Sequence, residues 1–263
     1  MDRSPTTPLL IASFHRSGSS LVAQMFHAAG MHLGGRLLGA KPSNPYGHFE
    51  DTDVIRFHDG LLRQDGHAWY GDRGPVAAFH GSGQAWIAKY VAQKRMRHAA
   101  FGVKDPRLCL TIRHWQAALG RVKVVFVYRS AQESCLSLWS RAIEDYKEGK
   151  ALALNRALAA SPDHVARMYA HNVASFLSWH RAYRHAAADV RFVAYDDVVS
   201  GARNIVAECR DDWGFALTPV SIEDYYDRGA VTASGDGATR FHAPRTERWL
   251  QETNAVLKDL CAS

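Results

Sequence analysis

The sequence predicts an α/β fold in which helices cover both faces of a central parallel sheet. Four short apolar runs are typical of buried strands, and segments with helical periodicity separate them. These strands are expected at residues 9–14, 101–104, 122–128 and 190–195. Such an alternation of strands and helices is typical of three-layer α/β domains. The 263 residues contain no internal repeat or low-complexity linker, so we expect one domain that spans residues 1–263.

The first strand ends in a basic turn that is rich in serine and glycine. Apolar residues recur at helical spacing from Leu21 to Ala29, so the turn lies between a strand and a helix. Backbone N–H groups at a helix N-terminus are free to bind an anion, and the helix dipole favours negative charge there. Gly18 lets the backbone approach a ligand closely, and Arg16 supplies charge. The turn is therefore a candidate phosphate-binding loop, formed by His15, Arg16, Ser17, Gly18, Ser19 and Ser20.

This loop lacks the lysine of nucleotide kinases. The Walker A motif G-x-x-x-x-G-K-[ST] has a lysine directly after its second glycine, whereas Ser19 follows Gly18 here. A small-molecule or nucleotide kinase is still the alternative function, because Tyr195-Asp196-Asp197 at the end of the last strand could mimic a Walker B carboxylate. A capped helix start that binds no ligand is the alternative interpretation of the loop.

A second phosphate contact is predicted at the end of the strand 122–128. Arg129 follows this strand, and Ser137 lies eight residues later in a helical pattern. A guanidinium group can donate two hydrogen bonds to phosphate oxygens, and a serine two helical turns later can add a hydroxyl if its helix packs beside the ligand. Taken singly, Arg129 could be a solvated strand end and Ser137 a surface residue.

These motifs resemble those of sulfotransferases that use 3′-phosphoadenosine 5′-phosphosulfate (PAPS). The R-S-G-S-S sequence at 16–20 resembles their 5′-phosphosulfate loop, in particular that of carbohydrate sulfotransferases, and Arg129 with Ser137 resembles their 3′-phosphate site. Segments 44–51 and 102–107 are similar to the N-P-x-G-x-x-E and K-D-P-R signatures of bacterial members. The resemblance implies a P-loop-NTPase-like three-layer fold. It also implies sulfuryl transfer from PAPS to a hydroxyl acceptor, with adenosine 3′,5′-bisphosphate as the product.

The same resemblance implies a general base. Glu50 ends the first of these signatures, just before an expected helix at 52–62, and the matching glutamate of the family is the usual candidate. A base that removes the acceptor proton near neutral pH should be partly desolvated. His48, favoured by its natural titration range, and His15 in the loop are the alternative bases. Glu50 or Asp51 could instead only cap the helix.

Two cations are expected beside the reacting group. Arg16 would neutralise the charge that develops on the bridging oxygen as the bond to sulfur breaks. Lys104 lies at the carboxyl end of the second strand, where open α/β folds bind ligands, although a salt bridge to Asp105 or Asp196 is its alternative role. Arg107 follows a proline and is expected to hold the loop shape. No metal is expected, because a sulfuryl group carries less negative charge than a phosphoryl group.

The C-terminal region contains a further candidate for the donor site. Thr232–Arg245 combines glycine and serine with basic residues, and it precedes an amphipathic helix. In the family a basic loop near the C-terminus closes over the nucleotide. We therefore expect Arg240 to contact a phosphate, although the usual glycine-rich spacing is not reproduced.

The overall charge favours acidic ligands. The formal net charge is +6, but the basic residues are scattered and form no tail. Without zinc-finger spacing, an RNP motif or a basic-region helix, nucleic acid is not an expected partner. A non-catalytic polyanion-binding protein is a further alternative, because it would keep the basic cleft without needing Glu50.

The acceptor is expected to be a hydroxyl-bearing molecule, with a saccharide favoured by the carbohydrate-type loop. Aromatic side chains next to polar ones suit a sugar face, but a lipid, phenol or peptide hydroxyl would use similar residues. The candidate residues for this pocket are Trp69, Tyr70, His80, Trp86 and Tyr146.

Cysteine usage and hydropathy bear on the compartment. The four cysteines are far apart and form no C-x-x-C motif, which is typical of reduced thiols. No apolar stretch reaches about 18 residues, and no charged leader precedes one at the N-terminus. We expect a cytoplasmic protein with no integral membrane segment. The 14 histidines form no H-E-x-x-H motif, so the sequence predicts no metal site.

Overall fold

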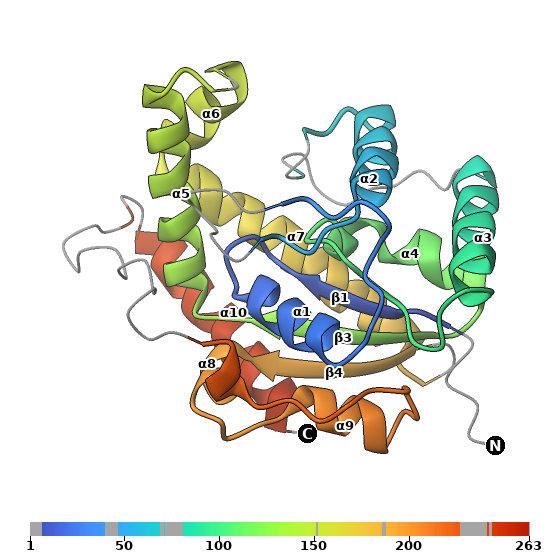
Figure 1. The fold of residues 1–263 in the computed structure, drawn as a ribbon. Coiled ribbons are helices and arrows are strands. Elements are labelled where there is room, and N and C mark those ends of the chain that lie inside the picture. Colours follow the sequence, from blue (N-terminus) through green and yellow to red (C-terminus); the bar gives the residue numbers. More distant parts are fainter. Residues whose placement is uncertain are drawn as a thin grey trace.

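A four-stranded parallel sheet forms the centre of the protein (Figure 1). The computed structural model describes residues 7–39, 47–68, 71, 81–150, 152–185, 188–226, 241 and 244–262. The strand order is β2-β1-β3-β4, formed by β1 (Leu9–Ser13), β2 (Gly102–Lys104), β3 (Val122–Tyr128) and β4 (Ala188–Ala194). The four predicted strands are therefore confirmed to within one or two residues at their ends.

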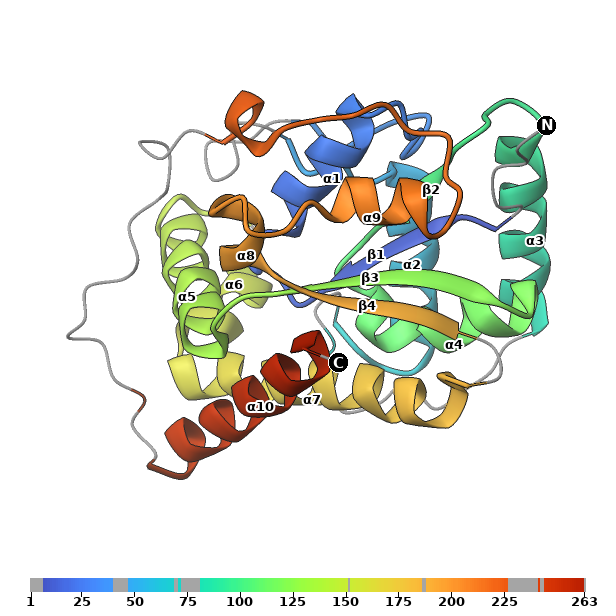
Figure 2. The ribbon, with the colours of Figure 1, turned by 90° about the horizontal axis from the view of Figure 1, so that it is seen from below.

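Helices cover both faces of the sheet, as Figure 2 shows from below. The helices α1 (Ser19–Ala28), α8 (Tyr195–Val199) and α9 (Ile205–Asp211) lie on one side. The other side is covered by α4 (Leu108–Leu119), α5 (Ala131–Lys147), α7 (Pro162–Tyr183) and α10 (Pro244–Ala262). The remaining helices are α2 (Thr52–Gln64), α3 (Gly81–Arg95), α6 (Leu152–Ala159) and the short 3₁₀ turn η1 (Ile222–Asp224).

Two apolar cores follow the alternation of the strands. Successive residues of a strand point to opposite faces of the sheet. The core beside α1 and α9 contains Leu9, Ile11, Val125 and Val127, whereas the core on the opposite face contains Leu10, Ala12, Val124 and Phe126. Because apolar side chains fill both faces, these strands read as continuous apolar runs in the sequence.

One local prediction needs correction. The segment Tyr195-Asp196-Asp197 does not end a strand but begins α8, where two acidic residues in the first turn suit the positive end of the helix dipole.

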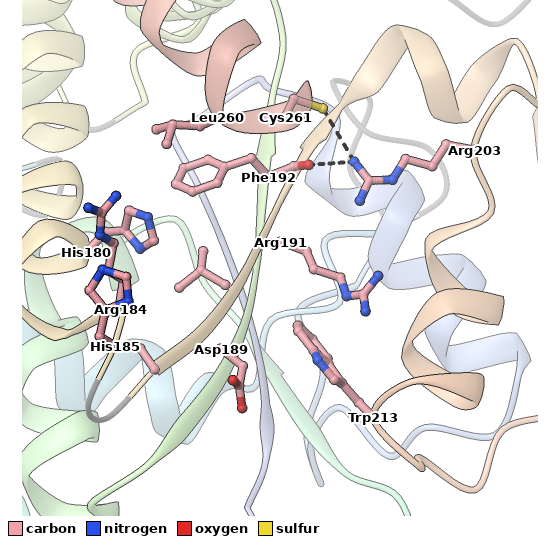
Figure 3. A pocket seen from close by; sticks show the side chains of 12 residues that line it. His180, Arg184, His185, Asp189, Arg191, Phe192, Arg203, Trp213, Leu260 and Cys261 are labelled. Atoms are coloured by element: carbon pink, nitrogen blue, oxygen red, sulfur yellow. Dashed lines mark hydrogen bonds between the residues drawn. The ribbon is translucent and has the colours of Figure 1, made fainter. Parts of the chain in front are cut away.

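Two pockets lie outside the predicted site. One of about 550 Å³ follows β4, with His180 and Arg184 on one side of the strand and Arg191 and Trp213 on the other (Figure 3). The second, of about 660 Å³, lies between α2 and α3. Within the described ranges, none of the helices has the length and apolar character needed to cross a membrane.

Candidate functional site

The parallel sheet brings the predicted motifs to one edge. Ser13 of β1 pairs with Val127 of β3, and Lys104 of β2 pairs with Ile11 of β1. The loop 14–18, Lys104 and Arg129 therefore lie at the carboxyl ends of neighbouring strands. This is the edge at which open α/β sheets bind ligands.

Gly18 and Arg16 give the loop an unusual backbone. Gly18 is the N-cap of α1 with a φ of 82°, and a Cβ atom built on it would lie 2.1 Å from the Tyr195 ring. Arg16 has a φ of 64°, and Phe49 has a φ of 55°. Left-handed backbone at non-glycine residues is uncommon and concentrates at functional sites. Here it occurs in the candidate donor loop and directly before Glu50.

Side chains connect the loop to the start of α5. The Nε of Arg16 donates a 3.0 Å hydrogen bond to the Oγ of Ser137, although 121 residues separate them. The hydroxyls of Ser17 and Ser134 lie 3.4 Å apart and are buried. Within the loop, Ser13 donates to Ser19 at 2.8 Å. The two predicted phosphate motifs thus form one continuous site.

Three arginines gather at this junction. The pKa of the Arg16 guanidinium is lowered, first by burial and then by the positive charges of Arg141 and Arg129, and Glu144 offsets this only in part. Like charges held close together in a partly buried place repel one another. An anion bound among these arginines would relieve that repulsion, which makes the junction a candidate anion-binding site.

Arg129 is held in place from two directions. Its Nε lies 2.9 Å from a carboxylate oxygen of Glu133, one helical turn further along the chain. Its guanidinium carbon lies 5.3 Å from the centre of the Tyr195 ring. The same ring lies next to Gly18, so Tyr195 is close to both the loop and Arg129.

A second group of charges surrounds Glu50. The Nζ of Lys104 donates to Oε1 of Glu50 at 2.6 Å and to Oγ of Ser20 at 3.4 Å. The Nη1 of Arg107 lies 4.0 Å from Oε2 of Glu50. Glu50 is only 7% exposed, which meets the expectation of partial desolvation. Lys104 is therefore paired with Glu50, and not with Asp105 or Asp196.

Asp51, and not Glu50, caps the following helix. Its Oδ1 accepts the backbone N–H of Asp53 at 2.9 Å, and its Oδ2 accepts the hydroxyl of Tyr90 at 3.0 Å. The capping alternative therefore applies to Asp51, and the carboxylate of Glu50 points to Lys104 instead.

The two candidate histidines lie in different surroundings. His15 has its pKa lowered well below the usual value by burial, and by the positive charges of Arg107 and Lys104. Its imidazole is neutral at pH 7, but protonating it in this place is costly, which disfavours it as a base. His48 is buried, and its backbone N–H donates to the carbonyl oxygen of Leu38 at 3.2 Å.

Several predicted residues lie elsewhere or outside the described part. Trp86 stacks on Phe57 and Tyr90 between α2 and α3, with ring centres 4.1 and 5.1 Å away, and Tyr146 is exposed on α5. Residues 69, 70, 80 and 240 lie outside the described part, so Arg240, Trp69, Tyr70 and His80 stay predictions. Across the described ranges, no three His, Cys, Asp or Glu residues are arranged to hold a metal ion.

Sequence reasoning missed several residues of the site. Arg141 follows Ser137 by four positions on α5, so helical spacing could have found it. Ser134 and the packing of Tyr195 on Gly18 depend on contacts between distant segments, which left no local signal. His58 is a polar residue in the buried stripe of α2, between Val54 and Leu61, and this was the only sign that it contacts Asp105.

Three solved structures to which the chain is similar are sulfotransferases. The sulfotransferase of Alicyclobacillus acidocaldarius matches with a TM-score of 0.54 and 12% identity, over 97% of this chain and 96% of that one. The sulfotransferase domain of the Synechococcus olefin synthase matches at 0.49 and 15% identity over 96% of both chains. Sulfotransferase STF1 of Mycobacterium tuberculosis matches at 0.48 and 15% identity, over 85% of this chain and 71% of that one.

The first of these similarities shows that the chain has the fold of a sulfotransferase, which confirms the predicted α/β, P-loop-NTPase-like class. No family model matches the sequence, and no curated protein matches it either.

Proposed function

We propose that this protein is a sulfotransferase that transfers a sulfuryl group from PAPS to a hydroxyl acceptor. The observation that supports this most directly is the hydrogen bond between Arg16 and Ser137. It joins the two segments that resemble the 5′-phosphosulfate and 3′-phosphate sites, in a chain with the sulfotransferase fold.

The donor would be held by the loop and by α5. The N-terminus of α1 and the serine hydroxyls of the loop would receive the 5′-phosphosulfate. Arg129 and Ser137 would hold the 3′-phosphate, because a guanidinium and a hydroxyl can both donate to its oxygens. Arg16 belongs to the loop and contacts Ser137, so its charge would stabilise the bridging oxygen of the bond to sulfur that breaks.

Glu50 would accept the acceptor proton. Its Oε1 already receives a hydrogen bond from Lys104, whereas its Oε2 lies 4.0 Å from Arg107, beyond hydrogen-bond distance. The acceptor hydroxyl would donate to Oε2 while its oxygen forms a bond to sulfur. As the bond between sulfur and the phosphate oxygen breaks, Arg16 and Lys104 offset the charge on the leaving adenosine 3′,5′-bisphosphate.

The favoured acceptor is a saccharide, and this rests on the carbohydrate-type R-S-G-S-S loop. Incubating the protein with PAPS and a panel of sugars, phenols, peptides and lipids, read by mass spectrometry, tests the reaction and the acceptor together. A product heavier by one sulfuryl group supports the proposal, and sulfation of phenols alone would overturn the saccharide assignment.

The kinase alternative has little support from the geometry. Ser19 occupies the position of the kinase lysine, is nearly buried and accepts a hydrogen bond from Ser13. Calorimetric titration with adenosine 3′,5′-bisphosphate and with ATP plus magnesium separates the two functions. Tight binding of ATP with magnesium, and none of the bisphosphate, would refute the sulfotransferase proposal.

A further inference from the structure

A buried histidine next to the candidate site is restricted to one tautomer. The indole N–H of Trp115 lies 2.9 Å from Nε2 of His58, and an indole nitrogen can only donate. Nε2 must therefore accept, so the proton of His58 is on Nδ1. That nitrogen lies 3.0 Å from Oδ2 of Asp105 and donates to it. All three side chains are fully buried, which makes each unmade hydrogen bond costly.

Asp105 passes this constraint on to Arg107. Its Oδ1 accepts the backbone N–H of Arg107 at 2.8 Å and the Nη1 of the same residue at 3.0 Å. Burial alone would raise the pKa of Asp105, but the charge of Arg107 and the hydrogen bond from His58 hold it well below its usual range. Asp105 is therefore ionised, and each of its oxygens has a fixed partner.

Arg107 is in turn held along two edges of its guanidinium group. Its Nε donates to Oδ1 of Asp59 at 2.7 Å, and its Nη1 donates to Asp105. A planar guanidinium held by two carboxylates cannot rotate without breaking one of these bonds. The Nη1 end is thereby kept 4.0 Å from Oε2 of Glu50, the oxygen assigned to the acceptor.

We propose that His58 and Asp105 are positioning residues for Glu50. The fixed tautomer of His58 orients Asp105, Asp105 together with Asp59 immobilises Arg107, and Arg107 restrains the carboxylate of Glu50. The inference rests on the proposed sulfuryl transfer. It adds that turnover depends on a hydrogen-bond chain that begins at Trp115, on the side of His58 remote from the carboxylates.

Two substitutions of His58 separate positioning from packing. His58→Asn keeps an N–H donor close to the place of Nδ1, whereas His58→Leu fills a similar volume without a donor. We expect His58→Leu to lower kcat by roughly 10- to 100-fold, the scale of a small misplacement of a reacting group, and His58→Asn to recover most of this loss. Affinity for adenosine 3′,5′-bisphosphate, measured by calorimetry, should be nearly unchanged in both, because His58, Asp105 and Arg107 are not among the residues assigned to the donor.

Ile112→Ala is the matched packing control. Ile112 is buried on α4, the helix that carries Trp115, and makes no polar contact that the chain uses. The Ile112→Ala substitution should lower the melting temperature and leave kcat near the wild-type value. If His58→Leu does not fold, Asp59→Asn tests the same restraint from the partly exposed side of Arg107, and kcat should fall several-fold at constant affinity for the bisphosphate.

The nitrogen NMR spectrum of the His58 imidazole reports which ring nitrogen carries the proton, and a role in packing alone would not require one fixed tautomer. The wild-type imidazole should show the Nδ1–H tautomer alone, and Trp115→Phe should release the second tautomer together with a loss of kcat. Full kcat in both His58→Leu and Asp59→Asn, or an Nε2–H tautomer in the wild type, would overturn this inference while leaving the proposed function intact. Absence of sulfuryl transfer by the wild type would overturn both.

Discussion

Replacing Arg129 by alanine isolates the proposed contact with the 3′-phosphate. Hydrogen bonds to charged groups contribute about 1.5–3 kcal/mol. Arg129 must share its charge with Glu133, which is 38% exposed, and such an exposed pair offsets about 0.5 kcal/mol of this at most. A net loss of about 1–2.5 kcal/mol corresponds to a roughly 5- to 70-fold weaker affinity for PAPS or adenosine 3′,5′-bisphosphate.

Calorimetry with two ligands tests this contact. Adenosine 5′-phosphosulfate lacks the 3′-phosphate, so Arg129→Ala should change its affinity little. Arg121→Ala is the matched control, because Arg121 also pairs with a carboxylate, on Asp189, but precedes β3 at the opposite end of the strand. Equal losses for the two ligands in Arg129→Ala, or a comparable loss in Arg121→Ala, would refute the assignment.

Three further substitutions test other parts of the site. Glu50→Gln should lower kcat about 10²- to 10⁴-fold with bisphosphate affinity nearly unchanged, and normal turnover would exclude Glu50 as the base. Gly18→Ala should abolish bisphosphate binding in calorimetry, because its Cβ would meet the Tyr195 ring. Gly30→Ala is the control, because Gly30 also has a positive φ, of 98°, but has open space around it. This control should keep bisphosphate binding and lose only about 1–2 kcal/mol of stability in denaturant unfolding. The lowered pKa of Asp105 implies stability that is present above the usual carboxyl pKa of about 4 and lost as the pH falls below it, so Asp105→Asn should show a flatter dependence of unfolding free energy on pH below about 4.

The strands and the turn at 15–20 were predictable because their signals are local. The apolar runs 9–14 and 122–128 and the turn at 15–20 each specify their own structure, whatever lies elsewhere in the chain. The end of the last strand was less predictable. Apolar character continues into Tyr195, but Asp196 and Asp197 favour a helix N-terminus, and the strand ends at Ala194.

The meeting of Arg16 with Ser137 required the family spacing, because no local pattern joins residues so far apart in the chain. The sheet explains why they meet: β1 and β3 are adjacent and parallel, so the segments that follow them begin side by side. The same reasoning applies to Lys104, which ends β2 on the other side of β1. Once the strand order is known, the ends of β1, β2 and β3 are expected at the same edge of the sheet.

The surroundings of Glu50 show where sequence reasoning ends. Its partner Lys104 was predicted for the same cleft, but whether the ammonium would pair with Glu50, Asp105 or Asp196 depended on the left-handed turn at Phe49, which no apolar pattern encodes. Asp105 is taken instead by His58 and Arg107, two residues whose sequence context indicates only a buried helix position and a loop. Cations and carboxylates compete in one buried place, and this competition decides which pairs form. Asp51 caps the helix, and Asp105 pairs with His58 and Arg107. Lys104 therefore pairs with Glu50.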